Sequence, residues 1–140
     1  MDLIGKYEGF YEYGGGYILP QFGSRVDILV TIKGKNDNFS GTVNEILSEH
    51  SVPLMSTLSG FKDNDFVSFV KRYDQLPSIK QDGSNEVVLG EGELEIEHTG
   101  YVDTKNKSIY GKWFIHHIGF DEEGEYESTS EGIWFLKKVG

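Results

Sequence analysis

Two histidines offer the clearest chemistry in this sequence. His98 lies two residues after Ile96 in one alternating segment, and His117 lies two residues after Ile115 in the next. Alternation turns both imidazoles toward the inner face of a sheet, from neighbouring strands. Two facing imidazoles bind a metal or exchange protons, but a metal site needs at least a third ligand, and no spacing supplies one. We interpret them as hydrogen-bonded interior or rim side chains, with catalysis by paired histidines as an alternative.

Arg72 is the second candidate, because it shares one face of the segment FVSFVKRY with Ser68 and Val70. An inward guanidinium in an acidic protein would bind a carboxylate ligand. Val67 and Phe69, on the other face, are equally apolar, so the alternation does not decide which face is inside. We favour an exposed Arg72 that pairs with a surface acid, and keep the inward orientation as the alternative.

A pocket for a small molecule would use a larger set of residues. Aromatic side chains supply most of the surface of such pockets, and a few polar groups fix the orientation of the ligand. The predicted ligand-binding residues are Tyr7, Tyr11, Ser59, Ser68, Arg72, His98, Trp113 and His117. In the alternative, the same aromatic side chains fill the interior and leave no cavity.

Other kinds of site are not visible. The chain has no cysteine, which excludes a thiolate zinc site and a cysteine nucleophile. The acidic stretches GEGELEIEH and DEEGEYE lack the spacing of a calcium loop, and the first reads as a solvated strand face. There is no phosphate-binding glycine loop and no Gly-x-Ser-x-Gly elbow. We therefore predict no catalytic residue, no metal and no cofactor, and favour a protein that is not an enzyme.

Strands must position these candidates, because the sequence shows no long helical pattern. Long connections alternate with short turns, which places most of the long loops at one end of a meander and leaves that end open. The expected strands cover residues 4–13, 25–33, 39–45, 55–61, 66–73, 92–102, 108–117 and 131–139, and the longer connections cover 17–24, 47–54, 74–90 and 119–126.

Glycine recurs inside the expected strands, as in IGKY, SGTV, TGYV and YGKW. Glycines within strands mark bends and close backbone approach, and a small sheet needs them to close on itself. Gly5 and Gly9 would let the first strand coil, while Tyr7 and Tyr11 fill the interior. We predict an all-β protein with one domain over residues 1–140: a closed antiparallel up-and-down barrel of about eight strands. A β-sandwich is the alternative.

The motif GKY opens the first strand, and EGIWFLKKV forms the last. They resemble the Gly-x-Trp strand and the closing strand of the calycin barrels, the group of lipocalins, fatty-acid-binding proteins and avidins. In that group a basic residue of the closing strand covers the first aromatic, which implies such a role for Lys137 or Lys138. The hairpins built from FSGTVNE, STLSGFKDNDFVSFVKRY and TGYVDTKNKSIYGKWFIHH are most similar to the avidin type. The resemblance implies an interior ligand, and pairing of barrels through exposed aromatics such as Phe114 or Phe135.

The biotin-binding residues of the avidin pattern do not carry over. Val43 and Glu45 lie where that pattern has a tyrosine and a serine, Trp134 where it has an aspartate, and Phe69 where it has a tryptophan. Biotin is therefore not the expected ligand. The stretch GKYEGFYEYGGGYILP is also similar to the first strand of the nitrobindins, which bind haem, but their C-terminal histidine motif is absent. Haem is a minor alternative.

The charge restricts the partners. There are 23 acidic and 13 basic residues and a net charge of −10, so nucleic acid and anionic membrane surfaces are disfavoured. The absence of cysteine and of a leader-like N-terminus favours a cytoplasmic protein, unless a leader is removed.

The leading hypothesis is a non-enzymatic barrel that binds a small apolar or aromatic molecule. The alternatives are an acidic interaction or inhibitor protein with a basic partner, and a barrel enzyme that uses the paired histidines.

Overall fold

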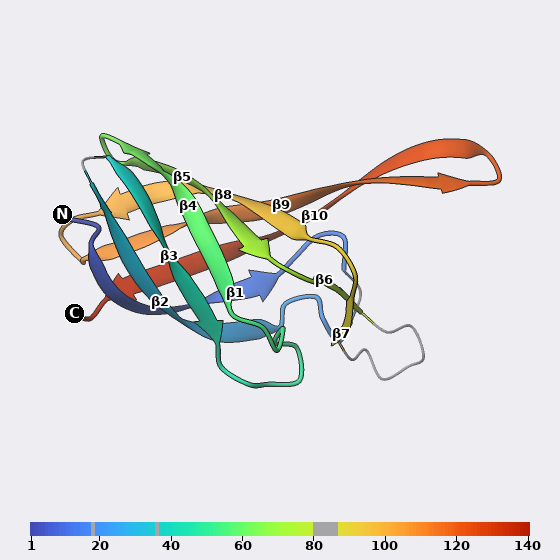
Figure 1. Cartoon of the computed structure of the whole chain (residues 1–140), viewed down its shortest axis with the longest axis horizontal. Helices are drawn as coiled ribbons and strands as arrows, with labels where there is room; N and C mark the ends of the chain where they lie inside the picture. The colour runs from blue at the N-terminus through green and yellow to red at the C-terminus, as the bar shows by residue number, and fades with distance from the viewer. Residues whose placement is uncertain (18, 36, 80–86) are drawn as a thin grey trace.

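The chain folds into strands joined by turns and loops (Figure 1). The computed structural model describes residues 1–17, 19–35, 37–79 and 87–140, apart from the side chains at 78, 79, 88 and 117–121. Within that part of the chain there is no helix that could cross a membrane. The strands are β1 (Gly5–Tyr13), β2 (Arg25–Lys35), β3 (Asn38–Glu45), β4 (Ser56–Asp63), β5 (Phe66–Tyr73), β6 (Leu76–Ile79), β7 (Val87–Gly90), β8 (Leu94–Asp103), β9 (Ser108–Asp121) and β10 (Gly124–Lys138).

Eight of the strands close into an antiparallel barrel in the order β1-β10-β9-β8-β5-β4-β3-β2. Each barrel strand pairs with the next barrel strand along the chain, and β1 pairs with both β2 and β10. The prediction of a closed up-and-down barrel is confirmed, and the β-sandwich is wrong. The remaining strands, β6 and β7, pair only with each other, in the connection from β5 to β8 that the sequence analysis interpreted as a loop.

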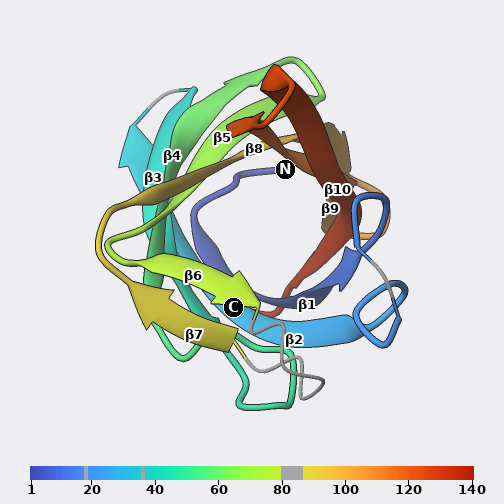
Figure 2. The same ribbon diagram turned by 90° about the vertical axis from the view of Figure 1, so that its right-hand side faces the viewer.

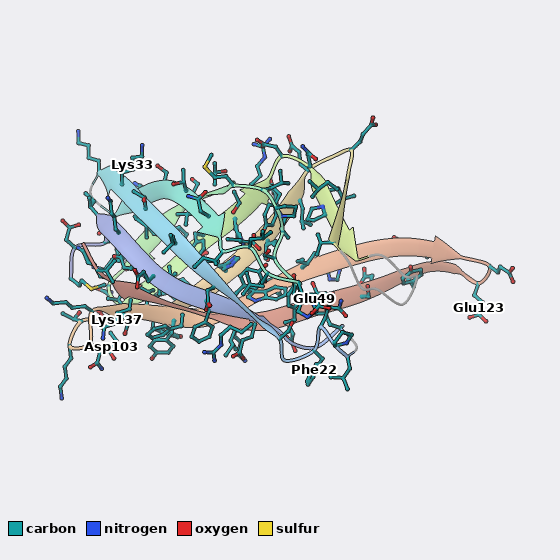
Figure 3. All side chains as sticks on the ribbon, turned by 90° about the horizontal axis from the view of Figure 1, so that it is seen from below. Phe22, Lys33, Glu49, Asp103, Glu123 and Lys137 are labelled. Atoms are coloured by element: carbon teal, nitrogen blue, oxygen red, sulfur yellow. The ribbon has the colours of Figure 1, made fainter. Side chains whose placement is uncertain are left out.

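The long connections meet at one end of the barrel, which we call the mouth. The connections β1–β2, β3–β4 and β5–β8 lie there, with β6 and β7 at the rim, while both termini lie at the opposite, closed end (Figures 1 and 2). Phe22 and Glu49 lie near the mouth, and Lys33, Asp103 and Lys137 near the closed end (Figure 3). The expectation that long loops gather at one end is confirmed.

The outer part of the hairpin of β9 and β10, residues 116–129, extends past the mouth as an arm (Figures 1 and 3). Pairing of β9 with β8 ends at Phe114, and pairing of β10 with β1 ends at Gly132, whereas β9 and β10 pair with each other as far as Asp121 and Gly124. The expected loop at 119–126 is wrong for this reason: both strands continue through most of it. Glu123 lies at the tip of the arm.

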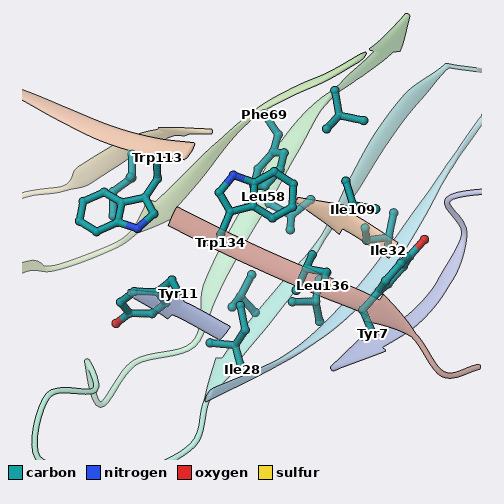
Figure 4. Close-up of a cluster of buried hydrophobic side chains, with 14 of the residues drawn as sticks. Tyr7, Tyr11, Ile28, Ile32, Leu58, Phe69, Ile109, Trp113, Trp134 and Leu136 are labelled. Atoms are coloured by element: carbon teal, nitrogen blue, oxygen red, sulfur yellow. The ribbon is translucent and has the colours of Figure 1, made fainter. Parts of the chain in front are cut away.

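Buried apolar side chains fill the closed half of the interior and continue into the mouth half, where Tyr11 and Trp113 lie (Figure 4). The space left between those of the closed half is about 10 Å³, no more than the smallest volume that holds a single water molecule. This packed half is therefore a conventional core. It is lined by Leu3, Ile32, Phe39, Leu58, Val67, Phe69, Ile109, Trp134 and Leu136.

Glycines allow β1 and β10 to approach closely where the barrel closes. A Cβ on Gly9 would lie 1.8 Å from the carbonyl oxygen of Phe135, and one on Gly132 would lie 1.9 Å from that of Glu12 and 2.5 Å from the Trp113 ring. The Trp113 indole instead covers Gly132 and donates a hydrogen bond of 3.2 Å to the Glu12 carbonyl. Glycines inside these strands thus make room for a neighbouring backbone and for a ring, as their positions predicted.

The N-terminal segment is held across the closed end. Tyr7 is buried, as predicted, and its hydroxyl donates to the Leu3 carbonyl at 2.7 Å. Lys138, which lies opposite Tyr7 in the pairing of β1 and β10, donates through Nζ to the Asp2 carbonyl at 2.7 Å. The closing strand therefore brings a basic residue back to the start of the chain.

Candidate functional site

The mouth half of the interior contains a cavity of about 410 Å³. This volume lies within the range of small-molecule sites, which is roughly 300–1,000 Å³. Residues of five barrel strands line the cavity, and residues of the β1–β2, β3–β4 and β5–β8 connections complete its wall. The lining residues are Tyr11, Tyr13, Gly16, Tyr17, Val52, Lys71, Tyr73, Leu76, Pro77, Val87, Leu94, Ile96, His98, Trp113, Ile115 and Ser130.

A buried carboxylate organises the polar side of this cavity. The Glu45 side chain has no exposed surface. Its Oε1 accepts hydrogen bonds from the Tyr11 hydroxyl at 2.5 Å and from the Val52 N–H at 2.8 Å. Its Oε2 accepts from the Tyr73 hydroxyl and, at 3.5 Å, from Lys71 Nζ. Four donors therefore hold one carboxylate, as a buried charge requires.

Lys71 brings a buried positive charge to the cavity wall. Its side chain is 5% exposed, and Nζ lies 4.6 Å from the centre of the Tyr11 ring and 4.8 Å from that of Tyr73. Such positions over aromatic faces stabilise an ammonium group. Burial lowers the pKa of Lys71, and the Glu45 carboxylate offsets part of this effect. In the described part of the chain, Lys71 is the one lysine or arginine that is buried.

His98 contributes a neutral imidazole. Its Nδ1 lies 3.0 Å from the Ile96 carbonyl, and its ring stacks on Phe69 with the centroids 4.6 Å apart. Burial and the nearby charge of Lys71 lower the pKa of His98 to about 3. Nδ1 must carry the proton that the carbonyl accepts, so Nε2 is an acceptor.

A cluster of aromatic rings continues the wall from Tyr11, whose ring lies 5.6 Å from that of Tyr13 and 6.3 Å from that of Trp113. Tyr13, Tyr17 and Trp113 contact one another edge to face, with ring centroids 4.8 to 6.3 Å apart. The Tyr13 hydroxyl donates to the His50 carbonyl at 2.8 Å, which ties the β3–β4 connection to this wall. The cavity thus joins a charged, hydrogen-bonding side to an aromatic one, an arrangement that suits a ligand with one polar end.

Strand alternation places the two charged residues inside. Glu45 ends an inward row on β3 that continues from Val43, and Lys71 lies between the inward residues Phe69 and Tyr73 on β5. Neither Glu45 nor Lys71 was among the ligand-binding residues predicted from the sequence. The signal was present: opposite charges occur near the mouth ends of two otherwise apolar rows, Glu45 as the last residue of its row and Lys71 one place before Tyr73.

Three of the predicted residues, Tyr11, His98 and Trp113, line the cavity. Tyr7 is buried instead near the closed end, where its hydroxyl contacts Leu3.

Three other predicted residues face outward, which corrects the inward orientation expected for Ser59 and Ser68 but agrees with the favoured exposed position of Arg72. Ser59 is exposed on β4, and Ser68 and Arg72 share the outer face of β5. Arg72 pairs there with Glu93 and lies 3.9 Å from Asp74, so the favoured prediction that it is exposed and pairs with a surface acid is confirmed. The inner row of β5 starts at Val67, so every even-numbered residue of this strand faces outward.

The two histidines do not lie opposite each other. His98 is opposite Trp113, whereas His117 is opposite Ser128, on the arm. His117 lies four residues beyond Trp113 along β9, which is about 13 Å of extended strand. The side chain of His117 lies outside the described residues. Among those that are described, no three His, Asp or Glu side chains are close enough together to hold a metal ion.

Comparison with known proteins adds no assignment: no family model, curated protein or solved structure matches this chain.

Proposed function

We propose that the protein binds a small, largely apolar or aromatic molecule in the cavity at its mouth. The observation that carries the proposal is the division of the interior: the closed half is packed, and the mouth half holds about 410 Å³ of space beside buried polar groups. A protein that needed its interior only for stability would gain by filling that space, because each unfilled volume costs packing energy.

The wall supports a defined orientation for the ligand. An apolar or ring-bearing portion would contact Tyr13, Tyr17 and Trp113, while a polar end would lie near Lys71 and His98. Lys71 donates hydrogen bonds, and Nε2 of His98 accepts them, so a carbonyl, ether or hydroxyl group suits this end better than a second cation.

The closed eight-stranded meander also supports the placement of this protein among calycin-like barrels, in which an interior ligand enters through the open end. In this proposal the exposed aromatics of the outer face would pair copies of the barrel. Both points rest on the architecture alone.

Binding can be tested with cinnamyl alcohol, an apolar ring with one hydroxyl. We expect it to shift the NMR signals of cavity residues and to bind in a calorimeter. The variant Ile96→Trp, which adds a ring within the cavity wall, should lose binding. The matched variant Glu95→Trp, one residue away on the outer face, should keep it.

Native mass spectrometry of freshly purified protein would show whether a ligand is retained. No retained ligand, together with no probe bound to the folded wild type, would overturn the proposal.

A second candidate function is suggested by the arm. Acidic residues occupy positions 121, 122, 123, 125 and 127, and no lysine or arginine occurs between Lys112 and Lys137. This segment projects away from the barrel, where it could contact a basic partner. An oligolysine peptide should bind the wild type at low salt and lose affinity at high salt. Changing the four arm glutamates to glutamine should abolish that binding if the arm is responsible.

A further inference from the structure

The ammonium group of Lys71 is the most loosely held member of the buried network. The Tyr11 hydroxyl and the Val52 N–H lie 2.5 and 2.8 Å from Glu45, and the Tyr73 hydroxyl contacts it closely, whereas Lys71 Nζ lies 3.5 Å away. Three donors thus satisfy the carboxylate without Lys71. The amine faces the cavity, where an incoming group can reach it.

The surroundings of Lys71 favour reaction with a carbonyl group. A lysine desolvated in an apolar pocket has a larger fraction of the neutral, nucleophilic amine, and such lysines form imines with carbonyl compounds. The aromatic wall would hold the apolar part of the same molecule next to the amine, which raises its effective concentration. Both conditions are met at one place in this barrel.

We propose that Lys71 binds an apolar aldehyde covalently as a protonated imine, with Glu45 as its counterion. This inference rests on the proposed function, because the aldehyde must first occupy the cavity. It specifies the chemical class of the ligand and the atom to which it is joined.

The step balances without a co-reactant. The Lys71 ammonium transiently gives up one proton, and the neutral amine attacks the aldehyde carbon to form a C–N bond. The carbonyl oxygen takes up two protons that began on the nitrogen and leaves as water when the C–O bond breaks. The product iminium retains one proton and its positive charge. No net charge is created or lost beside Glu45, so the buried ion pair persists in the adduct.

The experiment is reductive trapping with trans-cinnamaldehyde. The protein of residues 1–140 is incubated near pH 7 with the aldehyde and sodium cyanoborohydride, and the adduct is located by peptide mapping. We expect Lys71 to be modified about tenfold faster or more than Lys112, an exposed lysine on the outer face of β9, because Lys71 lines the cavity and Lys112 does not. Excess cinnamyl alcohol should protect Lys71 and leave Lys112 unaffected.

Two further variants sharpen the result. Lys71→Met should lose the fast modification while Lys112 still reacts at its original rate. Glu45→Gln should still form the imine, but its imine should lose its proton at a lower pH, seen as a shift of the long-wavelength absorbance of the conjugated iminium. If either variant does not fold, the alcohol competition on the wild type decides the question.

Failure of this inference can be distinguished from failure of the proposed function. Cinnamyl alcohol bound in the cavity, with Lys71 trapped no faster than Lys112, would overturn the imine and leave non-covalent binding intact. Binding of neither the alcohol nor the aldehyde would overturn both.

Discussion

At the scale of single residues, Glu45 is the group on which the mouth half of the barrel depends. It joins β3 to β1 through Tyr11, to β5 through Lys71 and Tyr73, and to the β3–β4 connection through Val52. A buried carboxylate bound in this way constrains four segments at once. Removing either partner of a buried ion pair leaves the other charge without compensation, which costs more than the pair itself contributes.

We expect Glu45→Gln to lower the free energy of unfolding by about 3 kcal/mol or more, because it leaves the Lys71 ammonium buried without a counterion. The double variant Glu45→Gln with Lys71→Met should be more stable than the sum of the two single changes implies. Urea unfolding of all four proteins gives this coupling. Strict additivity would show that the two side chains do not interact.

The buried imidazole of His98 makes stability depend on pH. The pKa of His98 is lowered to about 3 in the folded protein, while an unfolded histidine titrates near its ordinary value of about 6.5. Between these values the unfolded chain binds the extra proton, so stability falls as the pH is lowered from about 6.5 toward 3. The charge of Lys71, on the neighbouring strand β5, contributes to this shift.

The variant His98→Asn removes that titration. Between pH 6 and 4 we expect its unfolding free energy to fall less steeply than that of the wild type, by up to about 1 kcal/mol per pH unit. Urea unfolding at a series of pH values measures the slope. Parallel slopes for the two proteins would mean that His98 is protonated in the folded state.

The sequence predicted some of the site residues and missed others for a physical reason. His98 and Trp113 were found because their strands alternate clearly between apolar and polar faces. Lys71 was missed because both faces of β5 are apolar, and a charged residue is more often outside a barrel than inside. Arg72, its neighbour, was the more visible candidate, yet it lies outside and pairs with Glu93.

At the scale of elements, the outer face explains why β5 has two apolar sides. Phe66, Tyr101, Tyr110, Phe135 and Phe10 lie directly opposite one another across five adjacent strands and form an outer aromatic row. Cross-strand aromatic pairs stabilise a sheet on whichever face they occupy. The existence of the barrel strands could therefore be predicted from their composition, but the inner face of β5 could not.

Closure of the barrel depends on glycine where β1 meets β10. We expect Gly9→Ala to lower the free energy of unfolding by about 2 kcal/mol or more, because its Cβ would lie 1.8 Å from the Phe135 carbonyl oxygen and the strands must separate. Gly90→Ala is the matched control: its Cβ would lie 3.5 Å from the nearest atom, the Leu76 carbonyl oxygen, so its effect should stay within about 0.5 kcal/mol. Thermal and urea unfolding compare the two, and equal effects would contradict this account.

The arm, in contrast, takes no part in the strand pairing that closes the barrel. From Ile118 and Glu127 outward, β9 and β10 pair only with each other. We expect that replacing residues 118–127 with an Asn-Gly turn leaves the urea midpoint nearly unchanged, because no barrel pairing is lost. A large drop would show that the arm packs on the barrel in solution.

At the scale of the whole molecule, the interior is divided between a packed half and a hollow half. Whether a barrel of eight strands encloses a cavity depends on the summed volumes of all its inward side chains and on how its loops cover the mouth. No single motif determines the total volume of the inward side chains. A filled interior and a hollow one therefore both remained possible from the sequence. The short strands β6 and β7 add to the difficulty, because Leu76, Pro77 and Val87 complete the wall from a segment that reads as a loop.

This division separates the only two tryptophans of the chain. Trp113 lines the cavity, whereas Trp134 lies in the packed half and donates from its indole to the Lys112 carbonyl at 3.0 Å. Indole emission is sensitive to its immediate surroundings, so the molecule carries one fluorescent reporter and one internal reference. We expect a bound ligand to quench or shift the emission of Trp134→Phe and to leave that of Trp113→Phe constant. Occupancy could then be followed with light alone, without attaching a dye.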